Sequence, residues 1–180
     1  VMLDHNDLEA TFAPGRNFAT KLWNIGRFLL ANSTGADVRA LDAIDPERLQ
    51  RADRWILARM DIAVRECDEA LGPAHPTGAS RDGRPTWPER DRRAGLRLNE
   101  YAETARRFVW NELADWYVEA IKGRLAGTGD DREVARAVLV HVFDQALRLL
   151  HPIVPFITEA IWQRLPPARR PTGLLGRAQW

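Results

Sequence analysis

The polar residues with the clearest chemical pattern recur at helical spacing, about 100° per residue, near the start of the chain. They are Arg16, Asn17, Lys21, Trp23, Asn24 and Arg27. Cationic side chains bind phosphates, an indole ring stacks on unpaired bases, and an asparagine amide matches a base edge. We therefore take these six residues as candidate contacts to single-stranded nucleic acid. The spacing also fits an alternative in which Trp23 and Phe28 pack against another helix or a neighbouring domain.

The rest of the sequence offers no arrangement for catalysis or metal binding. It contains no glycine-rich phosphate loop and no G-x-S-x-G turn, and its four histidines lack the spacing of a helical metal site. We expect Cys67, on an apolar stripe, to be a buried inert thiol, and His151, before Pro152, to have a structural role at a turn. Glu112 and Asp115 have no partner base, so we expect them to be ion-paired. No catalytic residue, metal or cofactor is predicted for this segment.

Composition sets broad limits on the class of protein. The 180 residues carry 26 basic and 25 acidic side chains, so a net charge of +1 gives no general affinity for nucleic acid. Only Lys21 and Lys122 are lysines, and the other basic residues are arginines, whose planar fork suits phosphates and aromatic faces. One cysteine excludes a disulfide scaffold, and no apolar run is long enough to span a membrane. These features are typical of a globular cytoplasmic domain.

Apolar periodicity predicts an all-α fold, an antiparallel bundle of four to five helices. We expect helices at about 16–31, 46–71, 97–126, 131–150 and 155–165, and no strands. Asp45 and Pro46 would start the second helix, with a break near Ala52 where Asp53 could cap a new start. The expected core residues include Phe18, Leu22, Trp116, Phe156 and Trp162.

Three segments lie outside the expected helices. Residues 1–15, which contain no lysine or arginine, are expected to be an entry strap, and the first residue, Val1, suggests a piece of a longer chain. Residues 72–96 are rich in proline, glycine and arginine and are expected to form a mobile inserted loop, with Arg92 and Arg93 as secondary RNA candidates. Residues 166–180 form a tail.

Three motif blocks resemble a known family in their order and spacing. The first is R-N-F-A-T-K-L-W-N at 16–24 with R-F at 27–28, and the second is A-D-R-W-I-L-A-R at 52–59. The third joins F-V-W-N-E and D-W-Y-V-E, between 108 and 119, to L-L-H-P-I-V-P-F-I-T-E at 149–159, followed by I-W. Together they resemble the anticodon-binding helical bundle of the valyl-tRNA synthetases, which are class I aminoacyl-tRNA synthetases. The D-R-W-I-L block is shared with the isoleucine and leucine enzymes.

The resemblance implies a division of labour within a larger enzyme. The family's ATP-binding motifs, its editing domain and its C-terminal coiled coil are absent from this sequence. Residues 1–15 would link to the missing catalytic domain, 16–165 would recognise the anticodon loop of valine tRNA, and 166–180 would lead to the missing C-terminal region. The parent, expected to be monomeric, would load valine onto tRNA with ATP and magnesium. Two alternatives remain open: an isoleucine-type domain, and a protein-interaction bundle that binds no RNA.

Overall fold

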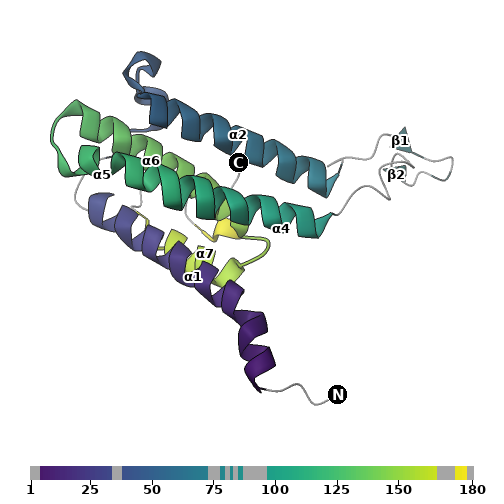
Figure 1. Cartoon of the computed structure of the whole chain (residues 1–180). Helices are drawn as coiled ribbons and strands as arrows, with labels where there is room; N and C mark the ends of the chain where they lie inside the picture. Colours follow the sequence, from purple (N-terminus) through teal and green to yellow (C-terminus); the bar gives the residue numbers. More distant parts are fainter. Residues whose placement is uncertain are drawn as a thin grey trace.

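The computed structural model describes residues 5–33, 38–72, 78–79, 82, 85–86, 97–165 and 173–177. Over these residues the chain is an antiparallel bundle of five helical rods, as the apolar periodicity predicted (Figure 1). The rods are α1 (His5–Ser33), α2 (Arg51–Leu71), a continuous rod of α4 (Leu98–Arg107), η3 (Phe108–Tyr117) and α5 (Val118–Ala126), then α6 (Asp130–Leu150) and α7 (Pro155–Trp162). No helix in the described ranges combines the length and apolar character needed to cross a bilayer.

Helix α6 forms the centre of the bundle. Every residue from Val134 to Val140 is buried, because this helix contacts all the other rods. Helix α2 and the α4–α5 rod pack on one another and on α6, while α1 and α7 cover the opposite side (Figure 1). Phe143, Trp162 and Tyr117 are among the largest side chains that solvent does not reach. Burial of these apolar surfaces is the main favourable contribution to folding.

The second predicted helix is divided where the sequence indicated. Asp45 accepts a hydrogen bond from the Glu47 backbone N–H at 2.9 Å and starts a short 3-10 helix, Pro46–Arg48. A second start follows at Arg51, where Asp53 accepts the Gln50 backbone N–H at 3.0 Å. The predicted break is confirmed. The N-cap residue is Gln50, and Asp53 takes part in the cap from the third helical position instead of capping the helix itself.

Helix α1 begins well before the expected boundary. Residues 5–15, expected as a strap outside the fold, are helical and continuous with the rest of α1 despite Pro14 inside the helix. From Glu9 to Gly15 every side chain except Ala13 is exposed, and Phe12 is 68% exposed. This part of α1 extends away from the other rods (Figure 1). Apolar periodicity did not reveal it because the side chains at 9–15 form no buried apolar face.

The π-helical segment η3 explains one wrong core prediction. An α-helical period placed Trp116 with Leu113 on the buried face, but Trp116 is 49% exposed and rests on Trp55, with ring centroids 4.3 Å apart. Each turn of η3 contains more residues than an α-helical turn, so the residues that face the core shift toward the C-terminus. Tyr117 and Val118 therefore take the buried positions. A single 3.6-residue period cannot follow such a change of pitch.

Phe156 is the second wrong core prediction, at 90% exposed. Helix α7 buries Thr158, Ile161 and Trp162, and a residue two positions before Thr158 lies about 200° around the helix. Phe156 therefore points away from the bundle. Phe18, Leu22 and Trp162 are buried, so the other three core predictions are confirmed.

The inserted loop and the tail are described only in part. Backbone pairing joins β1 (Gly78–Ala79) to β2 (Pro85–Thr86), a short antiparallel pair that the sequence did not indicate. The expected mobility of the loop, and Arg92 and Arg93, lie outside the described residues. In the tail, Leu175 is buried and its backbone N–H donates to Glu159 of α7 at 2.9 Å.

Candidate nucleic-acid interface

Helix α1 separates its side chains onto two faces as the sequence predicted. Phe18, Leu22, Ile25 and Leu29 form a buried stripe, with none more than 9% exposed. This stripe packs against η3, α6 and α7. On the remaining surface four of the six candidate residues are exposed, namely Arg16, Asn17, Asn24 and Arg27. The apolar stripe thus fixes the orientation of the polar face.

Two of the three cations on this face already have partners within the chain. Arg16 forms an ion pair with Glu9, two helical turns earlier. Lys21 pairs with Asp115 of η3, and its Nζ also lies 4.2 Å from the centroid of the Trp110 ring. The Lys21 side chain is 25% exposed. Lys21 is therefore held against η3 by a carboxylate and an aromatic face.

Arg27 differs from these two cations. It is exposed, and among the described residues no carboxylate forms an ion pair with it. Asn24, one turn earlier on the helix, is also exposed. The guanidinium of Arg27 is thus available to an external anion without the loss of an internal ion pair.

Trp23 is only partly on the outer face. Its ring is half-buried against the core, and the Arg164 guanidinium of the chain following α7 lies 5.1 Å from the ring centroid. The sequence left two interpretations of Trp23 open, a base-stacking ring on the outer face and packing against another helix. Trp23 and Phe28 are both partly buried against the core, so the packing alternative holds in part. The contact joins residues more than 140 positions apart, which helix periodicity cannot detect.

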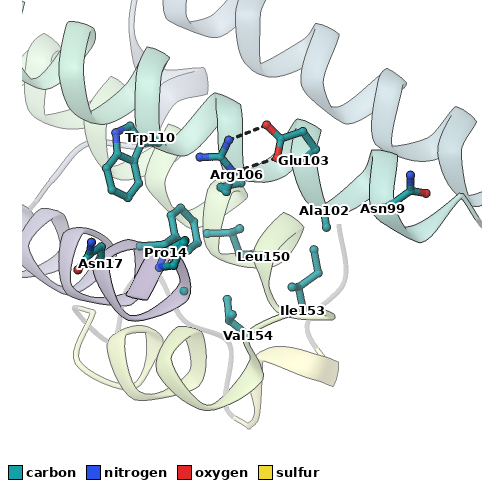
Figure 2. Close-up of a pocket in the computed structure, with 12 residues that line it drawn as sticks. Pro14, Asn17, Asn99, Ala102, Glu103, Arg106, Trp110, Leu150, Ile153 and Val154 are labelled. Carbon is teal, nitrogen blue, oxygen red and sulfur yellow. Dashed lines mark hydrogen bonds and ion pairs between the residues drawn. The ribbon is translucent and has the colours of Figure 1, made fainter. Parts of the chain in front are cut away.

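A groove of about 540 Å³ opens at the other end of the face, beside Asn17. Figure 2 shows α1 on one side of the groove, α4 and η3 on another, and the α6–α7 turn below. Its lining includes the apolar groups Pro14, Phe18, Trp110, Leu150, Ile153 and Val154 together with the amides of Asn17 and Asn99. Such a recess can take a flat ring and leave its polar edge to the amides.

The charged groups beside this groove are mutually satisfied. Arg106 donates to both oxygens of Glu103, at 3.0 and 2.6 Å, and the two side chains point toward one another (Figure 2). These hydrogen bonds hold the pKa of Glu103 below its usual value. The Trp110 ring stacks on Phe18 with centroids 6.1 Å apart. Sequence reasoning missed this groove because four separate elements form it.

The other polar candidates have structural partners. Arg59 donates to Glu112 at 2.8 and 2.7 Å, and Asp115 pairs with Lys21, so both carboxylates are ion-paired as expected. His151 Nδ1 lies 2.9 Å from Thr158 Oγ1, which ties the end of α6 to α7. Cys67 is buried, and burial raises its pKa to about 11. No cluster of metal-ligating side chains occurs within the described ranges.

The chain is similar in sequence to known proteins over most of its length. Residues 93–179 match the family model described as the anticodon-binding domain of tRNA ligase. The chain is 42% identical over 165 residues to a valine–tRNA ligase of Geobacter sulfurreducens, covering 89% of this chain and 16% of that protein. It is 36% identical over 173 residues to that of Petrotoga mobilis, covering 94% and 16%. The chain therefore spans about a sixth of the length of these relatives.

Proposed function

We propose that this chain, a homologue of one segment of the valine–tRNA ligases and of their anticodon-binding domain, binds the anticodon loop of valine tRNA. The observation that carries the proposal is the polar face of α1, four of whose six residues are exposed, opposite its buried stripe. We define the α1 face as Arg16, Asn17, Lys21, Trp23, Asn24 and Arg27. Its residue types match the phosphates and unpaired bases of a loop.

Different parts of the face would have different tasks. Arg27 and Arg16 would bind phosphates, with Lys21 joining them if it leaves Asp115. The groove beside Asn17 would receive one unstacked base, with the amides of Asn17 and Asn99 at its polar edge. Phosphate contacts would set affinity and position, and the groove would contribute base preference.

In the whole protein this segment would recognise the tRNA, and another region would catalyse the ligase reaction. The relatives are named as ligases of valine and tRNA, a reaction that would take ATP and magnesium at a site outside these residues. No described residue in this chain is assigned a catalytic role. The parent would act in the cytoplasm as a monomer, with this bundle holding the anticodon loop while the acceptor end reaches the catalytic site.

The test is tRNA binding by the longest protein that the gene encodes, at low and high salt, with valine tRNA and a non-cognate tRNA. Changing Arg16, Lys21 and Arg27 together to alanine should weaken binding of valine tRNA at least tenfold and reduce its salt dependence. Arg65→Ala is the matched control, because Arg65 is exposed on α2, on the other side of the bundle. Equal binding of both tRNAs by the unchanged protein, or full binding by the triple variant, would reject the proposed interface.

A further inference from the structure

The second cavity on the α1 side has a lining unlike that of the groove beside Asn17. Its volume is about 340 Å³, and it lies between α1 and the end of α7. The lining consists of Trp23, Gly26, Arg27, Leu30, Ile161 and Arg164. Two guanidinium groups therefore border it, and none of its described lining residues carries a carboxylate.

Close contact between the two helices fixes this cavity. A Cβ atom at Gly26 would lie 3.0 Å from Ile161 Cγ2, so only glycine lets α7 approach α1 this closely without displacing a neighbour. Ile161 is buried, so it has little room to move. Trp23 and Arg164 each lie one helical turn from this contact. Their approach, with the guanidinium 5.1 Å from the ring centroid, is therefore a result of the helix packing.

The charge of the cavity is not balanced by the described part of the chain. Arg27 has no ion pair there, and Arg164 only donates to the Ala160 backbone carbonyl, which leaves the rest of its fork available. Within the described ranges, most of the other arginines form ion pairs with carboxylates, as Arg59 does with Glu112. Two uncompensated guanidiniums beside one cavity favour an anion.

We infer that Arg27 and Arg164 together bind one phosphate of the RNA, at the mouth of the cavity beside Trp23. This inference rests on the proposed function and adds Arg164, which lies outside the α1 face, as an RNA contact. A guanidinium offers two parallel N–H donors to a phosphate, so two of them can fill its oxygen acceptors. The contact of Arg164 with Trp23 orients its fork before RNA binds, which reduces the entropy lost on binding.

The test is the affinity of the full-length protein for valine tRNA across a range of salt concentrations. Arg164→Gln should weaken binding roughly tenfold, as expected for loss of one charge-assisted contact. The slope of log affinity against log salt should fall by at most about 0.7, the value for one phosphate of a single strand, because Arg27 still contacts that phosphate. Arg164→Lys should recover part of the affinity because it keeps the charge and loses the planar fork. Arg65→Gln on α2 should bind like the unchanged protein.

A double variant separates a shared phosphate from two independent ones. If Arg27 and Arg164 hold the same phosphate, the two glutamine substitutions together should cost less than the product of their separate effects. If the losses in binding free energy of the two single variants add up to that of the double variant, the shared site is overturned. The shared site would also be overturned if Arg164→Gln binds tRNA normally with an unchanged salt slope. The same holds if its loss of tRNA affinity is no greater than that of Arg65→Gln. Weak binding by the Arg16, Lys21 and Arg27 triple variant in that case would leave the proposed function standing.

Discussion

At the scale of single residues, one buried carboxylate holds three elements together. Asp53 of α2 is 0% exposed and accepts hydrogen bonds from Tyr117 Oη at 2.7 Å and from Arg124 Nη1 at 2.8 Å. Burial beside Asp53 raises the pKa of the Tyr117 hydroxyl, which therefore stays a neutral donor. Burial alone would lower the pKa of Arg124, but its bonds to Asp53 and Asp131 outweigh that effect and raise it. The conspicuous aspartate of the D-R-W-I-L block is thus a structural anchor.

Removal of this anchor should be costly. Asp53→Ala leaves the Arg124 guanidinium, only 11% exposed, without its buried partner, and should lower the free energy of unfolding by about 3–5 kcal/mol. Asp131→Ala is the matched control, because it removes the exposed carboxylate of the same arginine and should cost at most about 1 kcal/mol. Urea denaturation followed by circular dichroism measures both values. Similar losses for the two variants would contradict the anchoring role of Asp53.

The single cysteine gives a pH-dependent prediction. With a pKa of about 11, Cys67 in the folded chain is about one part in a thousand thiolate at pH 8, so a thiol reagent should label it slowly. Labelling should accelerate as pH rises toward 11, and in urea, where the thiol has its ordinary pKa. Because burial raises this pKa, the stability that the neutral thiol provides is complete below about pH 8.5 and is lost as pH rises through 11. Fast labelling of the folded chain at pH 8 would contradict burial of the thiol.

At the scale of elements, two aromatic residues of α7 should respond in opposite ways to truncation. Trp162 is 0% exposed and donates its indole N–H to Asp144 at 3.2 Å, so Trp162→Ala should cost about 3–5 kcal/mol of unfolding free energy. Phe156, in the same helix, should lose no more than about 0.5 kcal/mol on change to alanine. Thermal or urea denaturation of the pair tests the observed rotation of α7. A large loss for Phe156→Ala would place that ring in the core instead.

Helix ranges and the α1 stripe could be predicted from the sequence because they depend on local periodicity. The same reasoning failed at η3, where a change of helical pitch moved Tyr117 inward and Trp116 outward. It also failed at residues 5–15, which are helical although the side chains at 9–15 form no buried apolar face. At the candidate site, the exposure of Arg27 could be predicted from the helical periodicity of the apolar residues in α1. The contact of Arg164 with Trp23 depends on packing between distant helices, which no local pattern records.

At the scale of the whole molecule, the chain is close to neutral, and the cations of the proposed interface are concentrated at a few places on the surface. The net charge is +1, so general attraction to polyanions is weak, and affinity must come from local groups. The two cavities lie at opposite ends of the exposed part of α1. One is lined by apolar groups, two amides and the Glu103–Arg106 ion pair, and the other is bordered by the guanidiniums of Arg27 and Arg164. An RNA loop that reaches both would have to match their separation, which favours one shape over others.

In the proposed interface, the ion pair between Lys21 and Asp115 would compete with RNA for the Lys21 ammonium group. An RNA phosphate that binds Lys21 must first displace the carboxylate of Asp115, which costs the free energy of that ion pair. An RNA that fits poorly makes fewer contacts to offset this cost than an RNA that fits well. Asp115→Asn removes the competitor with little change of shape, so it should tighten binding of both cognate and non-cognate tRNA by up to about fivefold. The non-cognate tRNA should gain more, and the ratio of the two affinities should shrink. The carboxylate of Asp115 would then lower the affinity for every tRNA and raise the ratio of cognate to non-cognate affinity.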